Sequence, residues 1–295
     1  MRRRKEKTVT NSLTYTTPRR YAARVLIAED NPVHRSLVRS LLEQMGCDVD
    51  AVGDGHEAVE SYSTAHYDII LMDWRMPKLD GVSATQEIRR IEKTKATASD
   101  DSRIPIIALT AHALPGDRNR CLSAGMDDYL CKPVSRRNLD LILSKWASPG
   151  DASGGRQVPG HEGEAESPDA DSILDMSQIE ELAAIERDGA PGLVSHLIDT
   201  YLGDAPAKLT LLKTAASEND LLGVQVATHS FKSASSTVGA HRLYKMCNAL
   251  ERDARSGVVE NLIQRVDGVL SEFSAVEGEL KELQARFSTT PESGT

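Results

Sequence analysis

Polar side chains follow short hydrophobic stretches at four points in the first half of the chain. They are Glu29 and Asp30 after residues 25–28, Asp73 after residues 69–72, Thr110 after residues 104–109, and Lys132 after residues 128–131. Three carboxylates held close together would repel one another and take up protons unless a cation were present. Mg²⁺ suits such a site, because it binds a few carboxylate oxygens, keeps several waters and bridges to phosphate. A carboxylate nucleophile beside Mg²⁺, a hydroxyl and an ammonium group is suited to phosphoryl transfer.

The segments that carry these residues alternate between strand and helix patterns. We predict strands over residues 25–28, 47–52, 69–72, 104–109 and 128–131, with amphipathic or short helices between and after them. Five such alternations predict an α/β fold with a doubly wound, five-stranded parallel sheet of the flavodoxin-like kind. The carboxyl ends of parallel strands meet at one edge of a sheet, so the polar residues are expected to gather there.

Each of these polar residues also has a structural interpretation. An aspartate at the end of a strand, such as Asp73, can simply cap the following turn, and for this residue alone the two interpretations have equal weight. Glu29 or Asp30 could cap the next helix. Capping does not explain why polar residues recur at four strand ends.

The second half of the chain shows a different pattern. Residues 148–172 are rich in glycine, serine, proline and acidic residues, which predicts a flexible linker. From residue 173 to about 287, apolar residues recur at steps of three and four, which predicts an up-and-down bundle of five or six helices. Breaks between helices are expected at residues 188–189, 203–204, 218–220, 239 and 256–257.

A second candidate site lies in the segment 227–240, which has a helical pattern. Four side chains share one face of this helix: His229, Lys232, Ser233 and Ser236. An exposed imidazole can accept a phosphoryl group on nitrogen, and the Lys232 ammonium would stabilise the added negative charge. A lone helical histidine is more often structural, but the lysine and small residues on the same face favour a reactive His229. His196 and His241 lack such neighbours and are interpreted as packing or surface residues.

The overall composition narrows the class of protein. The chain has 295 residues, 40% of them hydrophobic and 27% charged, which predicts a globular protein of about two domains without a membrane span. Its net charge of -9 disfavours nucleic-acid binding by the folded domains. The four cysteines lack metal-ligand spacing, so we expect free thiols and a cytoplasmic location. The basic residues 1–21 have no apolar segment after them and are predicted to be disordered, like the tail 289–295.

Residues 24–147 resemble a response-regulator receiver domain of two-component signalling. The matching residues are Glu29-Asp30-Asn31, Leu71-Met72-Asp73 with Met76-Pro77 and Asp80-Gly81, Leu109-Thr110-Ala111, and Lys132-Pro133. The resemblance implies that Asp73 is the phosphoacceptor and that Glu29 and Asp30 form an acidic pair that binds Mg²⁺ with it. It also implies that Arg75 supplies a backbone carbonyl to the metal.

The same resemblance assigns the remaining landmarks of this half. Thr110 would be the switch hydroxyl and Lys132 the partner of the phosphate, while burial of the aromatic Tyr129 would follow the state of Thr110. The family also implies a cis peptide bond before Pro133, a residue type at which cis bonds are tolerated.

Residues 175–287 resemble a histidine phosphotransfer domain, in which His229 would be phosphorylated and Lys232 would be its charged neighbour. The family often has glycine after that lysine, whereas this chain has Ser233, which is still small enough for a partner to approach. The order of the two domains is similar to the C-terminal part of hybrid histidine kinases. We therefore divide the chain into residues 1–21, a receiver over 22–147, a linker over 148–172, a phosphotransfer domain over 173–288, and the tail.

Together the resemblances imply a phosphorelay intermediate. Asp73 would receive a phosphoryl group from an upstream sensor histidine kinase, and His229 would pass phosphoryl groups to or from a response-regulator receiver. The sequence has no glycine-rich ATP-binding motif, so no autonomous kinase activity is expected. A regulator that acts by docking alone, with His229 as a phosphate sink, remains open. A Mg²⁺-dependent phosphatase with an aspartate nucleophile is disfavoured, because such enzymes have a second aspartate where this chain has Arg75.

Overall fold

The computed structural model describes residues 21–95, 103–110, 121–132, 134–147, 172–257 and 259–288. The expectations for the basic N-terminal segment, for nearly all of the linker, for the tail and for the peptide bond before Pro133 lie outside these residues. Strands run over β1 (Arg24–Ala28), β2 (Asp48–Val52), β3 (Ile69–Asp73), β4 (Ile106–Thr110) and β5 (Asp128–Cys131). They form one parallel sheet in the order β2-β1-β3-β4-β5. The predicted doubly wound fold is confirmed.

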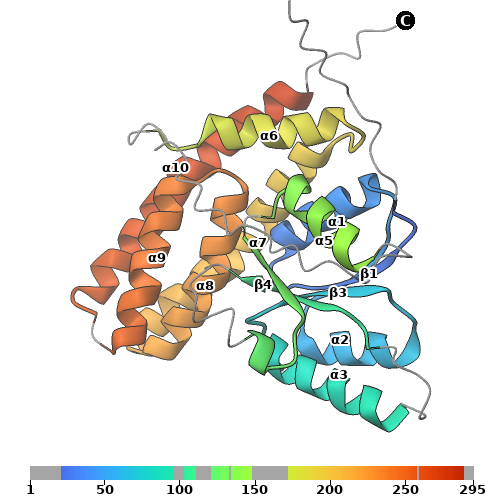
Figure 1. Ribbon diagram of the computed structural model, residues 1–295. Helices are drawn as coiled ribbons and strands as arrows, with labels where there is room; N and C mark the ends of the chain where they lie inside the picture. The colour runs from blue at the N-terminus through green and yellow to red at the C-terminus, as the bar shows by residue number, and fades with distance from the viewer. Residues whose placement is uncertain are drawn as a thin grey trace, which may run out of the picture.

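Helices cover both faces of this sheet (Figure 1). Helices α1 (Pro32–Gln44) and α5 (Arg136–Trp146) lie on one face, and α2 (Gly55–Thr64) and α3 (Gly81–Lys95) lie on the other. Successive residues of a strand point to opposite faces. On β3, Leu71 accordingly packs in the cluster beneath α1 and α5, whereas Ile70 and Met72 pack in the second cluster. Strands β1, β3 and β4 are therefore apolar on both faces, and their polar residues, Arg24, Asp73 and Thr110, lie at the strand ends.

The loop after β3 is held in place by close backbone packing. Gly81 begins α3, and a Cβ atom at this position would collide with the carbonyl oxygen of Asp73. The amide of Gly81 also donates to the carbonyl of Trp74, at 3.2 Å. Only glycine lets α3 begin this close to the strand end, so the position of Asp73 is fixed from both sides.

The C-terminal half is a helical bundle, as predicted. Within the described residues its helices are α6 (Met176–Arg187), α7 (Leu193–Ser217), α8 (Leu221–Thr237), α9 (His241–Ser256) and α10 (Leu262–Ser288). Tyr201, Phe231 and Phe273 pack against one another in its core, with ring centroids 5.8 to 6.0 Å apart. None of the helices in the described ranges contains a stretch long and apolar enough to cross a bilayer.

One expected helix break is wrong. Helix α7 runs without interruption through residues 203–204 and includes Pro206. Its buried face continues on both sides of that point through Tyr201, Ala205 and Leu209. Burial of this continuous stripe outweighs the unfavourable local preferences of glycine and proline.

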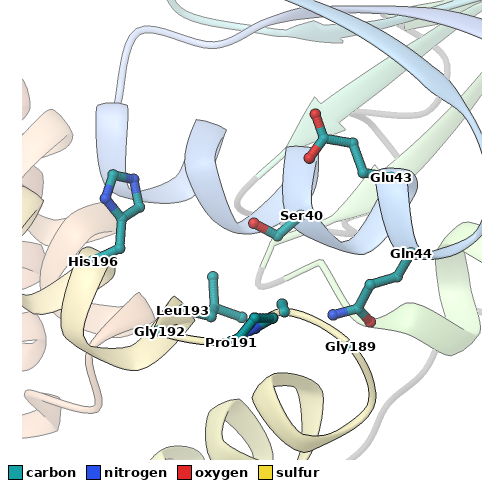
Figure 2. A pocket seen from close by; sticks show the side chains of 9 residues that line it. Ser40, Glu43, Gln44, Gly189, Pro191, Gly192, Leu193 and His196 are labelled. Carbon is teal, nitrogen blue, oxygen red and sulfur yellow. The ribbon is translucent and has the colours of Figure 1, made fainter. Parts of the chain in front are cut away.

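The two halves are in contact in the structure. Helix α1 packs against α7 and α8, and the buried cluster beneath α1 and α5 continues into the bundle. At one end of this contact, the side-chain amide of Gln44 donates to the backbone carbonyl of Ile185 at 3.0 Å. Nearby, Arg136 Nη1 lies 3.6 Å from Asp188 Oδ2. A hollow of about 350 Å³ lies there, and its lining residues come from α1 and from the turn before α7 and its first residues (Figure 2). His196 borders it, with its Nε2 3.4 Å from the Ser36 hydroxyl.

Candidate functional site

The structure brings the predicted acidic residues together at the carboxyl edge of the sheet. Glu29 and Asp30 follow β1 and Asp73 ends β3, and one oxygen of each lies within 4.8 Å of the others. Lys132 follows β5, and its Nζ lies 2.7 Å from both Glu29 Oε2 and Asp73 Oδ2. Glu29 and Asp73 are buried. One ammonium group thus bridges two of the three carboxylates.

The pKa values of the cluster reflect burial and mutual repulsion. Burial and the neighbouring Glu29 carboxylate raise the pKa of Asp73 well above its ordinary value. The same two causes raise the pKa of Asp30 to about 6. Burial also opposes the charge of Glu29, but Lys132 and His34 outweigh it and lower the pKa of that carboxyl. Burial and mutual repulsion therefore oppose ionisation of all three carboxylates at once.

His34 is a member of the cluster that sequence reasoning missed. Its side chain is buried in α1, and its Nδ1 lies 2.7 Å from Glu29 Oε2. Asn31 caps the same helix by accepting from the amides of Val33 and His34. The start of α1 thereby fixes Glu29, and Asp30 remains the carboxylate with which no described cation forms an ion pair.

The other predicted landmarks lie around this edge. Thr110 ends β4, and its carbonyl accepts from the Lys132 amide at 2.8 Å. Tyr129 lies on β5 opposite Ala108 and is half-buried against the cluster beneath α3. Arg75 directs its guanidinium to the helical bundle, where Nη1 lies 3.1 Å from Glu251 Oε1. The backbones of Thr110 and Lys132 are thus paired at this edge, whereas the contact of the Arg75 side chain with the bundle was not foreseen.

The His229 site is built from two helices of the bundle. His229 and Lys232 lie one turn apart on α8, and Glu251 on α9 faces both. Glu251 Oε1 is 3.1 Å from His229 Nδ1, and Glu251 Oε2 is 2.7 Å from Lys232 Nζ. Lys232 Nζ also lies 3.1 Å from Asn248 Oδ1. The two serines of this predicted face, Ser233 and Ser236, are half-buried.

These contacts determine which imidazole nitrogen can react. A carboxylate only accepts hydrogen bonds, so the Nδ1 that faces Glu251 carries the proton. Burial lowers the pKa of His229, and together with the cations Arg75 and Lys232 it outweighs the Glu251 carboxylate, which raises the pKa. The pKa of His229 is thus below its ordinary value, so the neutral ring predominates at pH 7. The lone pair of a neutral imidazole with a protonated Nδ1 is on Nε2. The side chain is 17% exposed, which is less than the sequence suggested.

Glu251 is the functional candidate that the sequence analysis missed. Four cationic or imidazole groups surround its buried carboxylate: His229, Lys232, Arg75 and Arg255. Burial opposes its charge, but His229 and Lys232 together hold the pKa of Glu251 far below its ordinary value. It lies on a different helix from His229, so helical spacing around the histidine could not reveal it. Only the antiparallel packing of α8 on α9 brings them together.

The two sites meet across the contact between the halves. Arg75, two residues after Asp73, pairs with Glu251, which also binds His229. Next to the acidic cluster, the side-chain amide of Asn31 donates to the backbone carbonyl of Ser230 at 3.1 Å. Lys208 of α7 also lies near enough to Asp30 to oppose the rise in its pKa. The predicted tether therefore joins two bodies whose candidate sites face a common interface.

Comparison with known proteins identifies the domains. Residues 25–144 match the family described as response regulator receiver domain, and residues 196–286 match the Hpt domain. The sensor histidine kinase GacS of Pseudomonas protegens is 34% identical over 233 residues, which are 78% of this chain and 24% of that protein. The signal transduction histidine-protein kinase BarA of Escherichia coli is 30% identical over 275 residues, 90% of this chain and 28% of that protein. The chain thus spans about a quarter of the length of these relatives.

A solved structure is similar to the N-terminal half. It is the receiver domain of the sensor histidine kinase PA1611 of Pseudomonas aeruginosa, whose structure has a magnesium ion coordinated in the active site cleft. That domain is 48% identical, covers 43% of this chain and 98% of its own, and has a TM-score of 0.38.

Proposed function

Because the chain consists of a receiver domain followed by a histidine phosphotransfer domain and resembles the C-terminal part of hybrid histidine kinases, we propose that it relays a phosphoryl group between Asp73 and His229. The observation that carries this proposal is the interface that joins the two sites through Arg75 and Glu251. An upstream sensor histidine kinase would phosphorylate Asp73, and a separate receiver would exchange phosphoryl groups with His229. The proposed domains are residues 22–147 and 173–288.

Phosphorylation of Asp73 requires its carboxylate as the nucleophile. One Oδ attacks phosphorus, a P–O bond to Asp73 forms, and the bond from phosphorus to the donor breaks. Lys132 is already 2.7 Å from Asp73 Oδ2, where its ammonium would neutralise charge on the transferred group. The Thr110 hydroxyl would donate to one phosphoryl oxygen as the switch residue, with Tyr129 responding to its position.

The acidic cluster fits Mg²⁺. One oxygen of each carboxylate lies within 4.8 Å of the others, and burial together with the Glu29 carboxylate raises the pKa of both Asp30 and Asp73, which a bound cation would counteract. We propose that Glu29, Asp30 and Asp73 hold the ion together with the backbone carbonyl of Arg75. When bound, Mg²⁺ would neutralise the phosphoryl oxygens and allow Asp73 to ionise.

Mg²⁺ affinity should therefore depend on pH. Since bound Mg²⁺ requires the carboxylates to be ionised and the pKa of Asp30 is about 6, protons compete with the metal below that pH. We expect the dissociation constant to rise as the pH falls, by at least about tenfold per pH unit below pH 6. Isothermal titration of the full chain with Mg²⁺ from pH 5 to 8 measures this. An affinity that stays constant over the whole range would contradict the proposed ligands.

The location and partners follow from the same proposal. The four cysteines, Cys47, Cys121, Cys131 and Cys247, are free thiols in the structure. Free thiols suit a reducing compartment. We propose that the chain acts in the cytoplasm, between a kinase and a downstream response regulator.

Labelling with a small acyl phosphate tests the proposed function. The full chain, Asp73→Asn and His229→Gln are incubated with labelled acetyl phosphate and Mg²⁺, and the labelled residue is mapped. Asp73→Asn should carry no label on either residue, and His229→Gln should carry label on Asp73 alone. The unmodified chain should carry label first on Asp73 and then on His229. Label on His229 in Asp73→Asn, or no label on Asp73 in the unmodified chain, would contradict the proposal.

A further inference from the structure

We infer that Arg75 is a positioning residue: its guanidinium couples docking of the two domains to the orientation of the His229 imidazole. This inference rests on the proposed exchange between Asp73 and His229. Arg75 reaches across the interface to Glu251, and the same carboxylate oxygen, Oε1, lies 3.1 Å from Arg75 Nη1 and 3.1 Å from His229 Nδ1. Its side chain thus has a function distinct from that proposed for its backbone carbonyl.

The surroundings of this contact make it a specific one. The side chain of Glu251 is 3% exposed, whereas that of Arg75 is 38% exposed. A hydrogen bond between ionised groups is shorter and stronger than a neutral one, and burial of one partner reduces screening by solvent. Arg75 can form this contact only when the loop that follows β3, two residues after Asp73, is seated against the bundle.

Glu251 does not need Arg75 in order to remain buried. Within the helical domain, Lys232 Nζ lies 2.7 Å from Glu251 Oε2, and Arg255 Nη2 lies 2.9 Å from Oε1. The Glu251 carboxylate therefore keeps two charged partners of its own domain when the domains separate. Loss of the Arg75 side chain should weaken docking and leave the helical domain folded, so an effect on transfer can be separated from an effect on stability.

The contact matters for the transfer step itself. The His229 Nε2 lone pair attacks the phosphorus on Asp73, a P–N bond forms, and the P–O bond to Asp73 breaks, so that the aspartate leaves as a carboxylate. The Nδ1 proton stays on the ring, which becomes a cation beside the Glu251 carboxylate. Transfer requires the His229 ring to point at the receiver. When Arg75 of the receiver binds the Glu251 oxygen that also contacts His229 Nδ1, the direction of the ring is fixed.

The pair also distinguishes between receivers. A receiver with an arginine two residues after its phosphoacceptor can form this contact, and one with a neutral residue there leaves Glu251 without a cross-domain partner. The chain's own receiver is therefore favoured at His229 over receivers that lack the cation.

The test measures first-order transfer of label from Asp73 to His229 in the full chain. Arg75→Gln should slow this transfer roughly tenfold, because a neutral side chain loses the charged hydrogen bond to a buried carboxylate. The rate is measured from chains already labelled on Asp73, so a change in the labelling of Asp73 itself does not enter it. Arg75→Lys keeps a cation and should regain part of the lost rate.

Arg136→Gln is the matched control. Arg136 is 32% exposed and also forms an ion pair across the interface, but its partner Asp188 is 68% exposed, whereas Glu251 is 3% exposed. Such a pair contributes little, so transfer should stay within about twofold. Equal transfer rates in Arg75→Gln and the unmodified chain, or equal losses in Arg75→Gln and Arg136→Gln, would overturn the inference. Absence of label on His229 in the unmodified chain would instead refute the proposed exchange.

Discussion

Replacing Lys132 with methionine should slow phosphorylation of Asp73 by roughly a hundredfold or more, because a preorganised cation at the reacting group is lost. Methionine keeps an unbranched side chain of similar size but has no charge. In the unmodified chain Nζ bridges Glu29 Oε2 and Asp73 Oδ2, each at 2.7 Å. The rate of label incorporation from acetyl phosphate at saturating Mg²⁺ measures the effect.

Lys145→Met provides the control for this experiment. Lys145 is also a lysine at the β5 side of the sheet, but it pairs with Asp128, at 2.7 Å, and lies outside the acidic cluster. Its replacement should leave labelling of Asp73 within about twofold. Equal labelling rates in Lys132→Met and the unmodified chain would show that the ammonium has no part in the reaction.

Replacing Glu251 with leucine should both destabilise the helical domain and abolish phosphorylation of His229. The change leaves the Lys232 ammonium, which is 3% exposed, without its carboxylate partner. Removing one member of a buried ion pair costs about 3–5 kcal/mol. It also removes the acceptor that keeps the proton on His229 Nδ1, so Nε2 is no longer the defined nucleophile. Denaturant unfolding and label mapping measure the two effects.

Glu251→Gln removes the charge of the side chain but keeps its shape. The effect of this change on the free energy of unfolding should depend on pH. The folded state holds the pKa of Glu251 below its ordinary value of 4.5, so the charge contributes stability above that pH. This contribution is lost as pH falls through and below 4.5. The difference in unfolding free energy between the unmodified chain and Glu251→Gln should therefore be largest near pH 7 and smaller at pH 4. A difference that grows on acidification would contradict the assigned contacts.

Much of the receiver site could be predicted from the sequence, because its residues are placed by strand ends. A buried parallel strand is a continuous apolar run, and the residue that follows it lies at the functional edge whatever the remaining details of packing. Asp73, Lys132 and the Glu29-Asp30 pair were located in this way. His34 was not, since nothing in the periodicity of α1 distinguishes a histidine that binds Glu29 from one that only packs.

The rest of the site depends on tertiary contacts between segments far apart in the sequence. Glu251 meets His229 only because α8 packs against α9, and Arg75 meets Glu251 only because the two domains dock. No local pattern encodes either contact. The expected break at residues 203–204 failed for a related reason, since burial of one face of α7 overrides the local preference of glycine and proline.

The central claim is that Asp73 and His229 exchange a phosphoryl group across the interface within one chain. The most direct test follows label from Asp73 to His229 at several chain concentrations, and compares the unmodified chain with an equimolar mixture of Asp73→Asn and His229→Gln. We expect a rate constant that does not change with concentration in the unmodified chain, and a slower, concentration-dependent transfer in the mixture. A rate proportional to concentration in the unmodified chain would contradict exchange within one chain.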